Sequence, residues 1–518
     1  MLKYWLISKI YLMKPYKQLM KRLVLTVLMT TALLTAAAYE MHYEVSFEPE
    51  THYINVELNY TTDTIGTPVV LKMPVWAPGY YVIVDYPKYL TDFSVSDETG
   101  KLLKWEKQGK NGWAFTPVCS KTQVRWRIYA NERSVAESRV ENTIGFLTPN
   151  GVFMHRDGDI AHDCHIHFTM PDTWTRISTG LAKEGNMPGC YYSKNFDVLY
   201  DSPFLFGNHF SEEFMHEGHK YEFALETPDG FAESQFKDDF KKMVSATSRL
   251  IGDVPYDNYC LIHLGKGGGG LEHQNSQACY SEGTFRFADR NAYLRYMSFV
   301  THEYFHLYNV KSIRPIELGP FDYDREVFTP MLWVSEGFTV YYETRLMMNA
   351  GICDSDYLLK DLSGSIATVE SMNGHKHMSL RQSSYDIWLN FFNRSANGAD
   401  VRISYYDKGP ILALLIDIEI RHATNAEKSL DDLMRFLYYR YFKDLGRGFS
   451  EEEFWQSVTE IAGSPLNEIR HYVDTTAEID YDRILAKAGL ALNHSNYQLF
   501  RLTNCDANAL KVRKSMGL

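Results

Sequence analysis

The hydrophobic period of the chain changes once, near Pro228, and this change limits the folds that the sequence can adopt. From Met41 to about Glu226, short runs such as HYEVSFE, QVRWRIYA and CHIHFTM alternate apolar and polar residues, which is the period of half-buried β-strands. After Pro228, runs such as ESQFKDDFKKMVSATSRLIG and KGPILALLIDIEIRHA repeat at helical spacing. We therefore predict an α+β protein with an N-terminal β-sandwich-like domain followed by a mostly helical domain.

The length of 518 residues suits two or three domains, each able to bury a core. The change of period predicts a β domain over residues 39–226 and a second, mostly helical domain over residues 227–492. The last segment, residues 493–518, is polar and without a clear period, and we expect a C-terminal tail there.

The first 38 residues are typical of a signal peptide. Lys21 and Arg22 precede an apolar stretch over residues 23–34, and three alanines follow at residues 36–38. Because this stretch is shorter than the ~20 residues of a spanning helix, we expect cleavage after Ala38 rather than a membrane anchor. The mature protein is expected in the periplasm or outside the cell, with no stable membrane span.

The charge of the mature chain argues against one class of partner. Removal of residues 1–38 takes away six basic residues and no acidic one, so the formal charge changes from −12 to −18. A strongly acidic chain repels the phosphate backbone, and we expect no nucleic acid partner. The seven cysteines are scattered without metal-ligand spacing, so the sequence does not indicate a disulfide scaffold.

The strongest chemical motif is HEYFH, residues 302–306. In a helix, His302 and His306 lie one turn apart on the same face, so both imidazoles can bind one metal ion with Glu303 beside it. A second helical segment, WVSEGF, supplies Glu336 after 29 intervening residues and completes the two-His, one-Glu set that catalytic zinc commonly uses. The alternative, that these are ordinary helix residues, stays open at this point.

The same residues predict a hydrolytic mechanism. Bound zinc lowers the pKa of water, and a neighbouring carboxylate can accept the proton, so Glu303 is the expected general base and later proton shuttle. The tetrahedral intermediate also needs a donor for its oxyanion. The segment YYDKG, residues 405–409, offers a phenol ahead of another apolar helix, although spacing alone does not separate such a tyrosine from one that packs in the core.

Three segments together resemble a known family: THEYFHLYNVKSIRP, LWVSEGFTVYYE and YYDKGPILALLIDIEIR. They are similar to the glycyl aminopeptidase family of gluzincin zinc metallopeptidases, metallopeptidase family sixty-one, which has a thermolysin-like catalytic fold. The segments WAPGYYVIVDYPKYLTDF and DSPF, residues 201–204, resemble the N-terminal β domain of that family. The resemblance thus extends over about residues 40–490.

The resemblance implies roles for individual residues. It implies a zinc site and a catalytic acid/base that agree with the residue analysis, namely His302, His306 and Glu336 as ligands and Glu303 as acid/base. It further implies Tyr406, the tyrosine of a Tyr-x-Lys-Gly motif, as the oxyanion donor, with the adjacent Tyr405 as its competitor.

A Gly-rich segment carries a second implied role. Residues 269–273, GGLEH, resemble the Gly-x-Met-Glu-Asn element of the wider aminopeptidase clan, whose acid receives the free amino terminus of the substrate. This implies Glu272 and Gly270 as substrate-binding residues. Leu271 and His273 depart from the Met and Asn of that element, and Glu272 is alternatively just an acid at the end of a Gly-rich loop.

The resemblance implies a zinc-dependent aminopeptidase that acts on peptides and favours small N-terminal residues. Many members of the family continue into a PDZ domain, whereas this chain ends about 25 residues beyond AKAGLAL, so we expect no PDZ domain here. Two alternative functions stay open: a zinc endopeptidase, and a non-catalytic protein that binds peptides or glycans on a peptidase scaffold. The sequence leaves the oligomeric state open.

Overall fold

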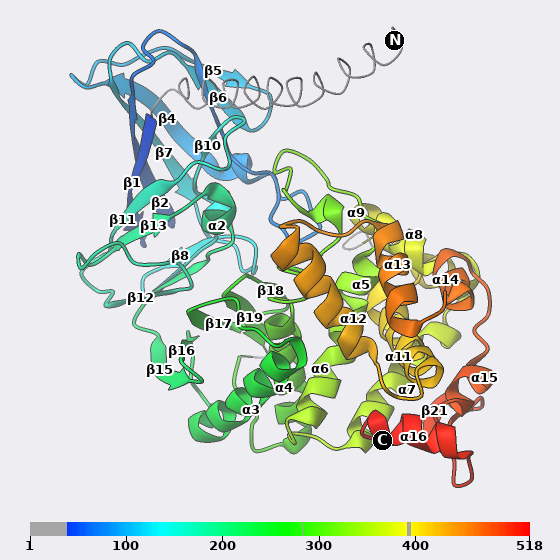
Figure 1. Ribbon diagram of the computed structural model, residues 1–518. Helices are drawn as coiled ribbons and strands as arrows, with labels where there is room; N and C mark the ends of the chain where they lie inside the picture. Colours follow the sequence, from blue (N-terminus) through cyan, green and yellow to red (C-terminus); the bar gives the residue numbers. More distant parts are fainter. Residues whose placement is uncertain (1–38, 282, 391–394) are drawn as a thin grey trace, which may run out of the picture.

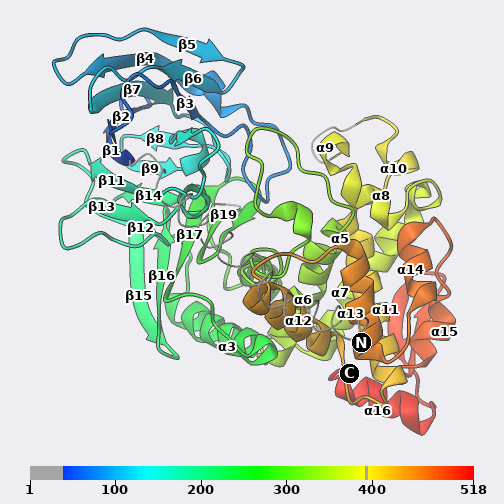
Figure 2. The same cartoon turned by 45° about the horizontal axis from the view of Figure 1, so that its top comes forward.

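The structure is a computed structural model that describes residues 39–281, 283–390 and 395–518 (Figure 1). The predicted signal peptide, residues 1–38, lies outside the described residues. A sheet-rich part is formed by the first half of the described chain, and a mostly helical part lies beside it (Figures 1 and 2). The predicted α+β architecture, with a sheet-rich N-terminal domain before a helical region, is confirmed.

The β domain contains a six-stranded sheet in the order β13-β11-β1-β2-β7-β4. Its strands are β1 (Tyr39–Glu48), β2 (Tyr53–Thr62), β4 (Leu90–Asp97), β7 (Lys121–Tyr129), β11 (Cys164–Thr169) and β13 (Cys190–Ser193). Side chains of β2 alternate between half-buried and buried over its whole length, because successive residues of a strand point to opposite faces. The buried face joins an aromatic core in which Tyr43 packs edge-on against Trp126 and Phe153.

Two four-stranded sheets complete the β domain. One has the order β10-β3-β6-β5 and the other the order β12-β14-β9-β8. The strands are β3 (Val69–Lys72), β5 (Trp105–Gln108), β6 (Gly112–Phe115), β8 (Arg139–Glu141), β9 (Ile144–Leu147), β10 (His155–Arg156), β12 (Arg176–Thr179) and β14 (Phe204–Gly207). Three short helices connect them: η1 (Tyr86–Tyr89), η2 (Pro149–Gly151) and α2 (Phe196–Tyr200).

A mixed five-stranded sheet, in the order β15-β16-β17-β19-β18, leads into the helical part. Its strands are β15 (Phe210–His216), β16 (His219–Leu225), β17 (Asn258–Lys266), β18 (Gly270–Glu272) and β19 (Ser276–Ser281). The long helix α3 (Glu233–Ile251) connects β16 to the parallel strand β17. This sheet therefore includes two strands from the sequence before residue 226, and β18 is one of its edges.

The remaining helices surround a large apolar core. They are α4 (Arg290–Phe305), η3 (Ile316–Leu318), α5 (Leu332–Ser335), α6 (Gly337–Asn349), α7 (Ser355–Ser371), η4 (Asn373–Lys376), α8 (Leu380–Tyr385), α9 (Ile387–Asn390), α10 (Gly398–Val401), α11 (Tyr405–Ala423), α12 (Leu430–Leu437), η5 (Tyr438–Asp444), α13 (Glu451–Ala462), α14 (Asn467–Asp474), α15 (Tyr481–Ala486) and α16 (Ala507–Ser515). Helix α6 packs against both α4 and α11. A capping box of Ser450 and Glu453 begins α13.

The contact between α6 and α11 is close because both helices have a glycine there. A Cβ at Gly337 would lie 2.5 Å from the Cα of Gly409, and a Cβ at Gly409 would lie 2.6 Å from the Cα of Gly337. Such distances are shorter than any ordinary van der Waals contact, so a side chain at either position would force the two backbones apart.

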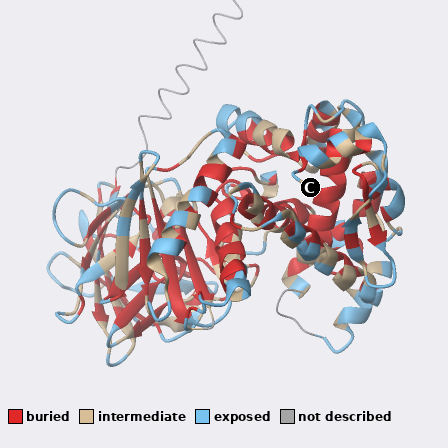
Figure 3. Cartoon of the chain, turned by 90° about the horizontal axis from the view of Figure 1, so that it is seen from below, coloured by how far each residue is buried: buried red, intermediate tan, exposed pale blue. Residues whose placement is uncertain are grey.

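The C-terminal segment is ordered rather than a loose tail. It forms the hairpin β20 (Leu490–Asn493) and β21 (Gln498–Arg501), followed by α16. Arg421 of α11 donates hydrogen bonds to the carbonyl oxygen of Ser515 at 2.9 Å and to its hydroxyl at 3.0 Å, which attaches the end of the chain to the helical core. Buried residues fill the interior of both parts (Figure 3). Among the helices of the described ranges, none is both long and apolar enough to cross a bilayer.

Candidate active site

Helix α4 places the two histidines of the HEYFH motif on the same face of the helix. Asp289 caps its N-terminus by accepting hydrogen bonds from the backbone N–H groups of Asn291 and Ala292. His302 lies in its last turn and His306 is the residue that caps its C-terminus, with ring centroids 4.6 Å apart and Nε2 atoms 3.0 Å apart. The two imidazoles thus present the same nitrogen to a common point, as the i, i+4 spacing predicts.

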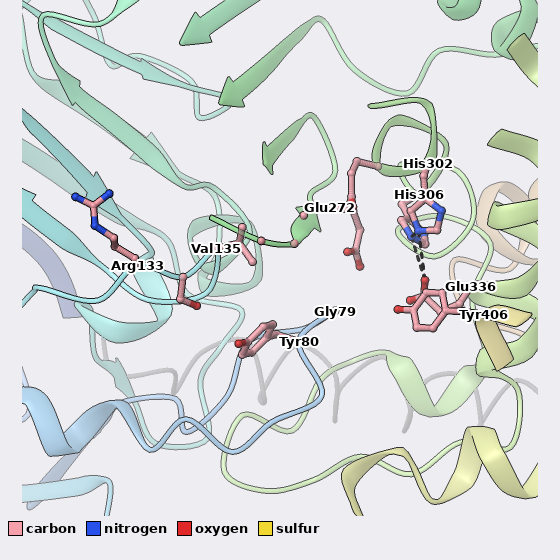
Figure 4. A pocket seen from close by; sticks show the side chains of 14 residues that line it. Gly79, Tyr80, Arg133, Val135, Glu272, His302, His306, Glu336 and Tyr406 are labelled. Atoms are coloured by element: carbon pink, nitrogen blue, oxygen red, sulfur yellow. Dashed lines mark hydrogen bonds and ion pairs between the residues drawn. The ribbon is translucent and has the colours of Figure 1, made fainter. Parts of the chain in front are cut away.

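Glu336 joins them from the junction between α5 and α6. Its Oε2 lies 3.2 Å from Nε2 of His306 and 3.7 Å from Nε2 of His302 (Figure 4). Burial raises the pKa of Glu336, but the two imidazoles outweigh it and lower the value to about 2. Burial lowers the pKa of His302, yet the carboxylates of Glu336 and Glu343 raise it above its ordinary range. The site therefore favours a carboxylate anion beside positive charge.

The donor set fits a divalent metal ion. In a tetrahedral site with bonds of about 2.0–2.1 Å, two donor atoms lie about 3.3–3.4 Å apart. The three donor atoms of His302, His306 and Glu336 are separated by 3.0 to 3.7 Å, close to that spacing. Two imidazole nitrogens and one carboxylate are also the ligands of many catalytic zinc sites, which keep a further position open.

The outer nitrogens of both histidines are held by neighbours that the sequence analysis did not identify. His302 donates from Nδ1 to Oε2 of Glu343 at 2.7 Å, and His306 donates from Nδ1 to the carbonyl oxygen of Asn309 at 2.8 Å. Each bond leaves Nε2 as the lone-pair donor toward the metal position. Glu343 lies seven residues after Glu336, so the spacing of two helical turns was the available signal.

Asn309 also connects the end of α4 to the second ligand segment. Its Nδ2 donates to the carbonyl oxygens of Val334 at 2.8 Å and of Ser335 at 3.0 Å. Because Ser335 immediately precedes Glu336, these bonds fix the distance between the histidine pair and the third candidate ligand.

Glu303 lies next to the metal donors and is buried. A Cβ at Gly270 would overlap Oε1 of Glu303, so the glycine of β18 lets the strand lie directly over this carboxylate. Burial is the main cause that raises the pKa of Glu303 to about 7. His302 and His306 oppose the shift, while Glu272 and Glu336 add to it. A carboxyl group with a pKa near neutrality can accept and return a proton, which suits an acid/base residue.

The two candidate tyrosines have different environments. Tyr406 lines the cavity, half-buried, with its ring centroid 6.4 Å from that of His302, and Figure 4 shows its phenol beside Glu336. Tyr405 is buried in the apolar core of the helical part. Among the two, Tyr406 is therefore the one placed to reach a substrate carbonyl, while its role as oxyanion donor stays a prediction.

A cavity of about 340 Å³ opens over these residues, and both parts of the molecule line it. The lining residues are Gly79, Tyr80, Arg133, Ser134, Val135, Gly268, Gly269, Gly270, Glu272, His302, Glu303, His306, Glu336 and Tyr406. The first five belong to loops of the β domain, as Figure 4 shows for Tyr80, Arg133 and Val135. The sequence analysis assigned no site residue to these loops.

Glu272 is a buried carboxylate at the wall of this cavity, with 4% of its surface exposed. One of its carboxylate oxygens, one of Glu303 and a ring nitrogen of His306 all lie within 4.8 Å of one another. In the described part of the chain, no hydrogen bond or ion pair connects the Glu272 carboxylate to another side chain. A Cβ at Gly79 would lie 2.5 Å from Oε1 of Glu272, so the β domain approaches this group closely.

Two family models match the chain: the Peptidase M61 N-terminal domain over residues 42–208 and the M61 glycyl aminopeptidase over residues 295–412. Together they match more than half of the sequence and include all the metal-ligand candidates. The chain belongs to the M61 peptidase family. The predicted family resemblance is confirmed, and the matched segments of this M61 chain support a peptidase.

Several solved structures share the fold of this chain. An aminopeptidase N family protein from Idiomarina loihiensis is 26% identical, with a TM-score of 0.82, over 88% of this M61 chain and 79% of that chain. An M1 zinc metallopeptidase from Deinococcus radiodurans is 13% identical, with a TM-score of 0.53, over 85% of this chain and 94% of that one. A variant of the latter enzyme, bound to a Tyr-Ser-Ala substrate, matches with a TM-score of 0.52, 13% identity and the same coverage. A sequence search against curated proteins gave no match.

Proposed function

We propose that this M61 chain is a zinc-dependent aminopeptidase that removes small N-terminal residues from peptides. The observation that carries the proposal is the position of Glu272. A buried carboxylate that pairs with no other side chain of the described residues, in a cavity beside three metal-ligand candidates, can receive the ammonium group of a peptide. An ammonium group held there lies next to the metal position, so the first peptide bond is the one that reaches it.

The metal fits the donor set described above, with His302, His306 and Glu336 as its ligands. When bound, zinc would polarise a peptide carbonyl and acidify a water molecule. Glu303 would accept the proton of the attacking water and return it to the leaving amine. Tyr406 would donate its phenolic hydrogen to the oxygen on which negative charge develops.

Support for a preference for small N-terminal residues comes from the matching family model, whose description is M61 glycyl aminopeptidase. Glycine has the smallest side chain of all residues, so a substrate with a small first residue fits this description.

A panel of free and blocked substrates tests the proposal. The zinc-loaded protein is expected to hydrolyse glycyl and alanyl anilides and to lose this activity when the amino group is acetylated, because an amide cannot pair with Glu272. Equal cleavage of free and blocked peptides would instead indicate an endopeptidase. No cleavage by a protein shown to contain one zinc ion would support a binding function. We also propose export of the protein, on the basis of residues 1–38.

A further inference from the structure

A tight turn follows Glu272, and the β domain holds it. Glu272 is the last residue of β18, and the backbone N–H of His273 donates to the carbonyl oxygen of Ser276 at 2.9 Å to close the turn before β19. Asp201, at the C-terminal end of α2, accepts from Nδ1 of His273 at 3.0 Å and from the backbone N–H of Gln274 at 2.8 Å. One carboxylate of the β domain thus holds two consecutive residues of the turn.

A third donor completes the coordination of Asp201. The Nζ of Lys311 lies 2.8 Å from Oδ1 of Asp201, and the lysine side chain is 6% exposed. Burial raises the pKa of Asp201, but Lys311 and His273 outweigh it and lower the value to about 2, so the carboxylate stays charged. Since Lys311 follows α4 by six residues, the same carboxylate also contacts the segment that continues from the metal-ligand helix. We call Asp201, His273, Gln274 and Lys311 the Asp201 clamp.

Two glycines of the β domain, Gly79 and Gly180, let this domain pack closely against β18 and the turn that follows it. Asn275 donates from Nδ2 to the carbonyl oxygen of Gly180 at 2.7 Å, and a Cβ at Gly180 would lie 2.5 Å from Oδ1 of Asn275. Gly79 approaches the Glu272 carboxylate equally closely. The polar bonds of this region therefore fix the turn, while the carboxylate of Glu272, as far as the described residues show, is fixed through its backbone and through packing.

We propose that Asp201 is a positioning residue for recognition of the substrate amine, because it fixes the turn that carries Glu272. This inference rests on the proposed aminopeptidase function. It also accounts for His273, which stands where the clan element has Asn: its imidazole is turned toward Asp201 and serves the turn. A carboxylate recognises an ammonium group through short, directed hydrogen bonds, so a small displacement of the strand weakens that recognition.

The first test compares Asp201→Asn with Asp197→Asn in the full-length, zinc-loaded protein. Asp197 lies on the same short helix and accepts a hydrogen bond from the Tyr323 hydroxyl at 2.7 Å, without contact with the turn. For glycyl anilide, Asp201→Asn should lower kcat/KM by about 10–100-fold, the size seen when outer-shell partners of functional ligands are lost, mainly through KM. Asp197→Asn should leave kcat/KM within about twofold, and both variants should keep one zinc ion.

The second test measures the contribution of the substrate amine separately from that of the metal-binding group. Glycine hydroxamate and acetohydroxamate share a metal-binding group, but only the former carries an amine. Calorimetry is expected to show that Asp201→Asn raises the Kd of glycine hydroxamate about tenfold or more and leaves the Kd of acetohydroxamate unchanged. In a Glu272→Ala background the same substitution should have no further effect, because the group that it positions is absent. An equal loss for both probes, or an undiminished loss in the Glu272→Ala background, would overturn the positioning role.

The same measurements separate this inference from the function on which it rests. If Glu272→Ala binds both probes as the wild type does, the amine site itself is refuted, whatever Asp201→Asn does. If Asp201→Asn does not fold, His273→Ala replaces it, because it removes one donor of the Asp201 clamp and leaves the charge pair with Lys311. An unchanged probe ratio in folded His273→Ala would then refute the positioning role.

Discussion

Glu343 offers the sharpest test of the proposed metal site, since it contacts the candidate ligand His302 without being a candidate ligand itself. It accepts hydrogen bonds from Nδ1 of His302 at 2.7 Å and from the hydroxyl of Ser298 at 3.0 Å. Two substitutions remove first the charge of this carboxylate and then its hydrogen bond with His302. Glu343→Gln removes the negative charge but keeps an oxygen that can accept from His302, whereas Glu343→Ala removes the acceptor altogether.

The expected magnitude follows from that single contact. A hydrogen bond to a charged group contributes about 1.5–3 kcal/mol. At about 1.4 kcal/mol for each factor of ten, this corresponds to about 10–150-fold in metal affinity. Losses of outer-shell partners generally amount to about 10–100-fold. We therefore expect about a tenfold rise in Kd for zinc in Glu343→Gln and a rise nearer to 100-fold in Glu343→Ala.

Competition with a chromophoric chelator measures the zinc Kd directly, without reference to turnover. Tyr342→Phe is the matched control, because it removes a hydrogen bond from the adjacent residue of α6 to Asp431 without touching a ligand. Because its acceptor is a carboxylate, the lost bond should cost about 1.5–3 kcal/mol of stability and leave the Kd unchanged. Identical zinc Kd values for the wild type and Glu343→Ala would refute the orienting role of Glu343.

Further outcomes are expected from four other changes. Glu303→Gln should retain zinc and lose most turnover, because the amide cannot accept the proton of water; near-native activity in the zinc-loaded variant would exclude Glu303 as the base. Tyr406→Phe should lower kcat by about 10²–10³-fold with little change in KM, as for other oxyanion donors, whereas Tyr405→Phe should change mainly the melting temperature. The pKa of Asp201 is lowered from 3.8 to about 2, which corresponds to about 2 kcal/mol of folding free energy. This contribution should be present above pH 4 and lost as the pH falls through 2. Acid unfolding of Asp201→Asn that follows the wild-type curve would contradict this. Mass spectrometry of the exported protein should find a new N-terminus directly after Ala38, and an intact N-terminus would disprove cleavage.

The candidate metal ligands were predictable because their chemistry depends on local spacing. An i, i+4 pair must share a helical face, and a two-histidine site needs one acid, so His302, His306 and Glu336 followed from pattern alone. Adjacent tyrosines were harder to separate. Tyr405 and Tyr406 differ by about 100° around the helix axis, and only the packing of α11 shows which of them faces the cavity.

The contribution of the β domain could not be read from the sequence. Gly79 and Asp201 lie far from Glu272 along the chain, and no local period indicates which strands and loops meet across a domain boundary. The same limit applies to β15 and β16, whose alternation predicted strands correctly. Their membership of the sheet with β17 depends on a parallel pairing across α3, which the alternation within β15 and β16 does not show by itself.

The contact between Gly337 and Gly409 couples two chemical groups that the sequence keeps apart. Gly337 directly follows Glu336, the candidate metal ligand, and Gly409 follows Tyr406, the candidate oxyanion donor, by three residues. The distance between these two candidate groups therefore depends on how closely α6 and α11 pack at the two glycines. An alanine at either glycine would push α6 and α11 apart. It would displace Glu336 and Tyr406 relative to each other, although every residue that lines the cavity would stay the same.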